Sequence, residues 1–144
     1  MSTRSQIKVR GSEVMLYKHS DGYPEETLPT LGKTMKSFIK ERGNEPDYAL
    51  AQIMRAFARR DEQRRKEWLK EIKDNPDEYS EYMLESYSKP RMTGWGIDTI
   101  RHGDIEYLYH IDLKEGKIRV EHIGHKGWNG GRSDEIVEVV YLLA

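Results

Sequence analysis

The sequence predicts an α+β fold in which an antiparallel sheet of five to six strands carries two to three helices on one face. Apolar residues alternate in short segments at both ends of the chain, as in half-buried strands. The middle of the chain repeats its apolar residues at helical spacing instead. Because the strands are segregated from the helices in the order ββ-ααα-ββββ, we expect antiparallel pairing within a single domain, 1–144.

The first two strands are expected at residues 3–9 and 13–19, with Ile7 and Val9 on one face of the first. The short turn between them contains Gly11, which is typical of a hairpin. Residues 20–24 combine Asp-Gly with a proline and therefore predict a loop.

Three helices are expected next. The first carries apolar residues from Leu28 to Ile39 and ends at Gly43, and the second opens near Pro46. Residues 59–67 of the second are almost wholly charged, so the sequence allows one long helix or two helices broken near Asp61. A short, tyrosine-rich third helix follows Asn75-Pro76.

The remaining strands are expected at residues 95–101, 105–111, 118–123 and 136–142. A tight turn at residues 102–104 is expected to join the first two of these, and a glycine-rich loop at residues 124–133 precedes the last.

Composition bounds the function. The chain has 144 residues and a net charge of −1. It contains no cysteine, which excludes disulfides and thiolate chemistry. No global positive field exists to hold nucleic acid, so such binding would need a local patch. The longest apolar run is far too short for a membrane helix, and no signal peptide is visible at the N-terminus. We expect a cytoplasmic protein.

The glycine-rich loop is the most suggestive local feature. Its backbone amides could form a nest for an anion, with charge from His125, Lys126 and Arg132 and a flat aromatic face from Trp128. It is neither a Walker sequence nor a dinucleotide-binding fingerprint. The alternative interpretation is an ordinary loop with Trp128 packed on the core.

Other chemistry has weaker support in the sequence. His110 and His122 could share an ion if their strands pair, but no motif has metal-ligand spacing, so we expect no metal. The acid–base candidates are His19, Asp21, Asp98, His102, Asp104 and Glu106. The presence of aspartate at positions 21 and 104 is explained by turn geometry alone, because aspartate is favoured in glycine-containing turns. We therefore expect no catalytic residue and no cofactor, and the sequence leans against an enzyme.

Two segments carry a resemblance. The chain opens with Thr3-Arg4-Ser5 and continues, after the first hairpin, into an H-x-D-G-Y-P element at residues 19–24. This pattern resembles a broad group of small proteins common in phages, prophages and other mobile elements. Such relatives usually carry an aromatic residue where Ser20 stands and a glycine where Glu26 stands. The resemblance implies a viral or mobile-element origin, a location in the cytoplasm of the host cell if the protein is viral, and a role in countering a host process by binding. It implies no catalytic residue.

The leading hypothesis is therefore a non-enzymatic, homo-oligomeric protein that captures a small anionic ligand such as a nucleotide signal. The expected ligand-binding residues come from the loop and from the N-terminal turn: Arg4, His19, Asp21, Tyr23, His125, Lys126, Trp128 and Arg132. One alternative is an inhibitor or adaptor that binds a host protein through its charged and tyrosine-rich helices. The other is a small nucleotide hydrolase or lyase that uses His19 or His102 as general base.

Overall fold

A computed structural model describes residues 3–90, 94–123 and 136–143 of the chain. The described residues contain six strands and three helices: β1 (Ser5–Val9), β2 (Met15–Lys18), α1 (Pro24–Arg42), α2 (Pro46–Asp74), α3 (Glu81–Ser88), β3 (Trp95–Asp98), β4 (Tyr107–Asp112), β5 (Lys117–Ile123) and β6 (Ile136–Leu142). The α+β class is confirmed. By contacts the chain divides into two compact units, one of Met1–Met54 with Gly94–Ala144 and one of Arg55–Thr93.

The first unit is built on a sheet with strand order β3-β2-β1-β4-β5-β6. The prediction of an antiparallel sheet is wrong at one pair, since β1 and β4 run parallel, with Ser5 beside Tyr107 and Val9 beside Ile111. The prediction failed because it placed a tight turn at residues 102–104, which would have paired the strands on either side of the turn antiparallel. Residues 99–106 do not turn back beside β3. They cross to the far side of the β1–β2 hairpin, so β4 starts from the same end of the sheet as β3 and runs in its direction.

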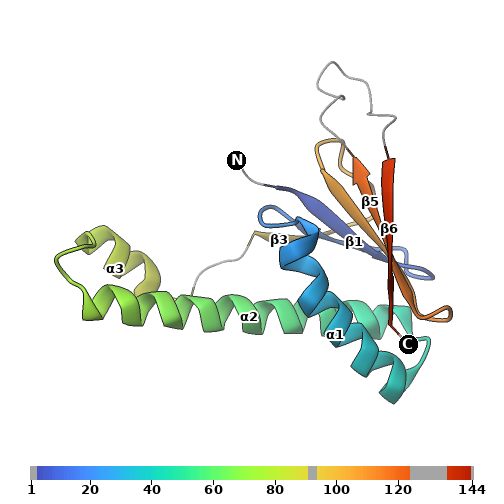
Figure 1. The fold of residues 1–144 in the computed structure, drawn as a ribbon, viewed down its shortest axis with the longest axis horizontal. Coiled ribbons are helices and arrows are strands. Elements are labelled where there is room, and N and C mark those ends of the chain that lie inside the picture. Colours follow the sequence, from blue (N-terminus) through green and yellow to red (C-terminus); the bar gives the residue numbers. More distant parts are fainter. Residues whose placement is uncertain (1–2, 91–93, 124–135, 144) are drawn as a thin grey trace. The chain divides into compact units, whose positions relative to one another are not determined.

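One face of the sheet is buried beneath α1 and the first turns of α2 (Figure 1). Alternate residues of a strand point to the same face, so this face carries the odd-numbered residues of β1 and β4. The fully or nearly fully buried side chains of the two layers include Ile7, Val9, Tyr109, Ile111, Leu31, Met35, Phe38, Leu50 and Ile53. We call the opposite face, which carries the even-numbered residues of β1, the open face.

The open face has a small core of its own at one end. Met15 and Leu108 are buried there together with Ile105 and Ile123, and Tyr17 packs against them. The crossing segment 99–106 supplies Ile105 and is anchored by Gln6, which is fully buried. Its side-chain amide donates to the carbonyl oxygen of Ile100 at 2.9 Å, and its carbonyl oxygen accepts the N–H of His102 at 2.8 Å.

Helix α1 begins at Pro24, four residues before Leu28, the first apolar residue expected in this helix. Pro24 occupies the first turn of the helix, where the backbone N–H groups have no partner within the helix and the missing N–H of proline costs nothing. Glu25 and Glu26 follow it and complement the positive end of the helix dipole. Gly43 ends the helix as expected, with φ at +71° and its N–H donated to the carbonyl of Ile39.

The second unit contains most of α2 together with α3. The charged segment does not interrupt α2, which runs unbroken from Pro46 to Asp74 and so resolves the alternative left open by the sequence. Arg65 binds Glu62 one turn earlier and donates to the carbonyl of Tyr87 at 2.6 Å, which ties α3 to α2.

The helices in the described part of the chain are all too polar or too short to span a lipid bilayer.

Candidate functional site

The H-x-D-G-Y-P turn is held mainly by its backbone. Gly22 donates its N–H to the carbonyl of Thr3 at 2.9 Å and accepts the hydroxyl of the buried Tyr109 at 2.5 Å. Asp21 adopts a left-handed conformation with φ at +55°, and its carbonyl oxygen accepts hydrogen bonds from Lys18 and from the Thr27 hydroxyl. The turn thereby joins β1, β4 and the start of α1.

Glycine is required at position 22 by close approach rather than by its φ angle. A Cβ atom there would lie 2.7 Å from Cβ of Ser5 and 2.9 Å from the carbonyl oxygen of Thr3. Tyr23 precedes α1, and its carbonyl accepts the N–H groups of Glu26 and Thr27. Of the predicted ligand-binding residues, Asp21 and Tyr23 are thus accounted for by the architecture of the turn.

Arg4 and His19 are brought together around Tyr17 on the open face. Arg4 contacts Asp104 at 2.6 Å, and the Nδ1 atom of His19 lies 3.1 Å from the Tyr17 hydroxyl. Burial and the negative charge of Asp104 raise the pKa of the Tyr17 phenol above its usual value, while Arg4 opposes the shift. The phenol is therefore protonated throughout the physiological pH range.

A second imidazole lies on the other side of the same tyrosine. The ring of His102 stacks on Tyr17 with centroids 4.4 Å apart and planes inclined by 17°. Its Nε2 atom lies 2.7 Å from Oδ2 of Asp98, and this hydrogen bond is the main cause of a lowered pKa of that carboxyl group. We call Tyr17, His19, Asp98 and His102 the tyrosine–histidine cluster.

The four predicted residues of the glycine-rich loop, His125, Lys126, Trp128 and Arg132, lie outside the residues that the structure describes. The anion nest therefore remains a prediction. Two described sites on the first unit carry side chains suited to binding or catalysis: the tyrosine–histidine cluster and a hollow farther along the open face.

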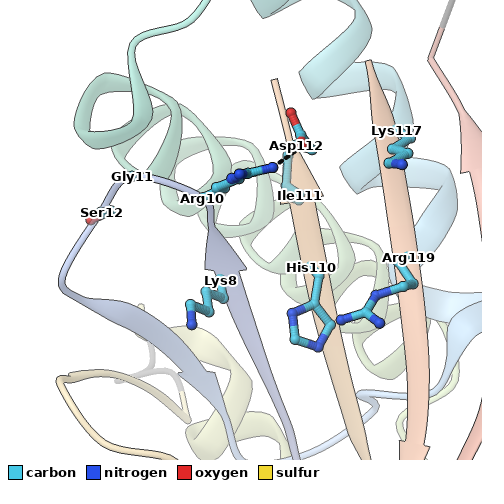
Figure 2. A pocket seen from close by; sticks show the side chains of 9 residues that line it. All are labelled: Lys8, Arg10, Gly11, Ser12, His110, Ile111, Asp112, Lys117 and Arg119. Carbon is cyan, nitrogen blue, oxygen red and sulfur yellow. Dashed lines mark hydrogen bonds and ion pairs between the residues drawn. The ribbon is translucent and has the colours of Figure 1, made fainter. Parts of the chain in front are cut away.

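This hollow, which we call the basic groove, lies over β1, β4 and β5 and has a volume of about 600 Å³ (Figure 2). It falls in the range of roughly 300–1,000 Å³ that is usual for small-molecule sites. Its lining residues are Lys8, Arg10, Gly11, Ser12, His110, Ile111, Asp112, Lys117 and Arg119. Figure 2 shows the basic side chains rising from the strands on the side away from the helices.

Two carboxylates contact basic side chains of the basic groove. Asp112 accepts from Arg10 at 3.1 Å, and Glu121 lies 2.9 Å from Nε2 of His110. The ammonium groups of Lys8 and Lys117 have no side-chain partner in the described part of the chain. Among the described lining residues, Lys8, Arg10, Lys117 and Arg119 supply four cations and Asp112 supplies one carboxylate, so the groove attracts anions.

Sequence reasoning did not single out the basic groove. The signal is the repeated pattern Lys-x-Arg, which occurs at Lys8 to Arg10 and again at Lys117 to Arg119. In a strand, residues two apart share a face, so each pattern places two cations on one side. Only the pairing of β1 and β5 with opposite edges of β4 reveals that the two pairs of cations meet.

The strand register also separates the two histidines considered for a metal. Tyr107 pairs with His122 and His110 pairs with Arg119, so the imidazoles of His110 and His122 lie on opposite faces of the sheet. Among the described residues, no group of three or more histidine, aspartate or glutamate side chains is arranged to hold a metal ion.

Comparison of the chain with protein-family models, with curated proteins and with solved structures finds no match. The resemblance to phage-associated proteins stays a prediction from its N-terminal residues.

Proposed function

We propose that this protein captures a small anionic ligand, of the size and charge of a nucleotide, in the basic groove. The observation that carries the proposal is the convergence of Lys8, Arg10, Lys117 and Arg119 from neighbouring strands on one hollow of about 600 Å³. The site differs from the loop expected from the sequence, but the ligand class is the same. The resemblance to phage proteins favours a role in which capture of such a ligand counters a host process in the cytoplasm.

Phosphate is the anionic group that suits the basic groove best. Guanidinium groups bind phosphate oxygens through paired N–H donors, whereas ammonium groups act as compact point charges. The groove offers both, and Lys8 and Lys117 need not break a described ion pair in order to bind. A nucleoside diphosphate or triphosphate would bring enough negative charge to engage several of these cations together.

The test is a thermal-shift and calorimetric screen against mono-, di-, tri- and cyclic nucleotides. A ligand at one hundred times its Kd stabilises the folded state by about 2.7 kcal/mol. For a chain of this size, that stabilisation raises Tm by roughly 5–11 °C. Affinity should fall as salt is raised, because the groove is open to solvent. No shift with any nucleotide at millimolar concentration would contradict the proposal.

A pair of double variants assigns the site. Lys8→Ala with Lys117→Ala removes two cations of the basic groove and should weaken binding by at least tenfold, whereas folding stability changes little. Lys33→Ala with Lys36→Ala removes the same charge from exposed positions of α1, behind the other face of the sheet. Equal weakening by both double variants would show that net charge, and not the groove, governs binding.

The second unit supports a different candidate function, the binding of a host protein. Trp68 is 47% exposed although Tyr87 and Tyr79 pack against it, and Tyr82 on α3 is 79% exposed. Aromatic residues with a polar atom are enriched in protein interfaces. A partner whose binding survives the Lys8/Lys117 double change but is lost in Trp68→Ala would favour this alternative.

Homo-oligomerisation also remains a proposal. Light scattering at micromolar concentration would show a mass above the 16.9 kDa of one chain. A monomer mass at every concentration tested would remove this proposal and leave ligand capture standing.

A further inference from the structure

The tyrosine–histidine cluster has the groups that acid–base catalysis needs. Its two imidazoles, from His19 and His102, both contact Tyr17, and all three side chains are at least partly exposed to solvent. The cluster lies on the open face together with the basic groove. Tyr17 pairs with Gln6 across β2 and β1, and Lys8 of the groove is two residues farther along β1. That step along a strand is roughly 7 Å.

His102 is the more rigidly held of the two imidazoles. Asp98 accepts its Nε2–H, Tyr17 stacks on its ring, and its main-chain N–H is bound by the buried Gln6. Asp98 is itself fixed, because its other oxygen accepts the N–H groups of Thr99 at 2.7 Å and of Ile100 at 3.2 Å.

This arrangement selects the tautomer of the imidazole. With a proton on Nε2 toward Asp98, the lone pair of neutral His102 is on Nδ1, which has no hydrogen-bond partner within the described residues. A carboxylate that orients an imidazole in this way also stabilises the imidazolium formed when the ring takes a proton. His102 therefore has the geometry of a general base, and Asp98 is a positioning residue.

His19 is placed to give a proton. The protonated phenol of Tyr17 donates to Nδ1 of His19, which leaves the proton of a neutral His19 ring on Nε2. When His19 is charged, both of its nitrogens carry protons and Nε2–H can act as a general acid. Base and acid thus flank one tyrosine on a face that also attracts phosphate.

We propose that His102 and His19 act as general base and general acid in the cleavage of single-stranded RNA on the open face. The inference rests on the proposed function, because the basic groove must hold the phosphates of the strand. In the reaction, His102 takes the proton of a ribose 2′-hydroxyl, and that oxygen attacks the adjacent phosphorus. The bond from phosphorus to the 5′-oxygen breaks, and the leaving oxygen takes a proton from His19. The products are a 2′,3′-cyclic phosphate and a 5′-hydroxyl end.

RNA is the substrate class that fits these groups because it supplies its own nucleophile. The cluster provides two proton-transfer groups and neither a serine nor a cysteine to attack the substrate. Transesterification by the 2′-hydroxyl needs one base and one acid, with no further reactant. An extended polyanion also suits a site in which the cations lie to one side of the reacting groups.

The experiment uses a fluorescently labelled single-stranded RNA and the DNA of the same sequence, each incubated with the full chain in the presence of EDTA. Fluorescence anisotropy measures binding, and mass spectrometry identifies the new ends. We expect both strands to bind but only the RNA to be cut, since DNA lacks the attacking hydroxyl. Binding of RNA with no cleavage after prolonged incubation would overturn catalysis and leave anion capture standing. Absence of RNA binding would overturn the cleavage proposal, whereas the nucleotide screen decides separately whether the groove captures small anions.

Variants assign the roles and exclude a contaminating nuclease. His102→Gln and His19→Gln should each slow cleavage by about 100-fold or more, the usual contribution of one acid or base. His122→Gln, on the other face of the sheet, should cut at the wild-type rate. Thermal unfolding verifies that each variant folds, and exposed His19 provides a variant with little risk to the fold. Wild-type rates in both His102→Gln and His19→Gln would overturn the proposal.

Asp98→Asn tests the positioning role separately. Asparagine can still accept the two main-chain N–H groups, but it does not hold the charged imidazolium as a carboxylate does. We expect one limb of the plot of cleavage rate against pH to move along the pH axis, while the affinity for RNA stays unchanged. A profile that keeps its shape would show that Asp98 has only a structural role, and the assignment of His102 as the oriented base would fail.

Discussion

Substitution of Gly22 by alanine tests whether the H-x-D-G-Y-P element is an architectural turn. The new methyl group would meet Cβ of Ser5 at 2.7 Å and the Thr3 carbonyl oxygen at 2.9 Å, and neither belongs to the far end of a flexible side chain. Overpacking of this kind costs about 1–3 kcal/mol. The loss should be read from urea unfolding, and each kcal/mol should lower Tm by roughly 2–4 °C.

Two further variants make the test specific. Gly103→Ala places the same methyl group where no atom lies within 4 Å and φ is not positive, so it should be neutral or should stabilise by a few tenths of a kcal/mol. Ser5→Gly removes one of the two clashing groups, so the double variant with Gly22→Ala should lose less stability than the sum of the single changes, with a coupling of about 0.5–2 kcal/mol. Additive losses, or a neutral Gly22→Ala, would refute the reasoning.

Three other changes have defined outcomes. Tyr109→Phe removes the buried hydrogen bond to the Gly22 carbonyl and should cost about 1–3 kcal/mol in urea unfolding, and a loss below about 0.5 kcal/mol would contradict the contact. The hydrogen bond from the Glu115 N–H lowers the pKa of Asp112, so this carboxylate stabilises the fold above about pH 4 and the contribution is lost as pH falls. Asp112→Asn should therefore make unfolding midpoints depend less on pH below 4, and an unchanged acid limb would contradict it. Arg65→Lys should lower the Tm by several degrees, because an ammonium group cannot bind both a carboxylate and a main-chain carbonyl of α3 with the geometry of a guanidinium; an unchanged Tm would remove this role.

Local patterns in the sequence predict most elements of the fold because each depends on residues close in the chain. Alternation at Ile7 and Val9 predicts β1, and Gly43 predicts the end of α1, which its positive φ explains. The parallel β1–β4 pair could not be predicted in this way. It depends on whether residues 99–106 turn back or cross the sheet, and the side chain that anchors the crossing, Gln6, is more than ninety positions away.

The same distinction applies to the candidate sites: individual residues could be predicted from the sequence, but contacts between distant residues could not. His19 and His102 could be proposed from the sequence as acid–base residues, since histidine is the side chain most often used in general acid–base catalysis. Their common contact with Tyr17 could not, because it joins a hairpin near the N-terminus to the crossing segment. The basic groove was missed for a similar reason, since Lys8 and Lys117 are brought to one face only by their shared neighbour β4.

The parallel pair also shapes how the chain reaches its native state. Each β1–β4 partner, such as Ser5 with Tyr107, is about a hundred residues apart in sequence, so a large loop must close before the centre of the sheet forms. Domains dominated by such distant pairings fold in milliseconds to seconds rather than microseconds. On the ribosome, at about 5–20 residues per second, the hairpin of β1 and β2 waits roughly 5–20 s for β4 to be synthesised. During that interval β1 presents an unpaired edge of the kind that recruits other strands, so nascent chains should depend on chaperones until β4 arrives.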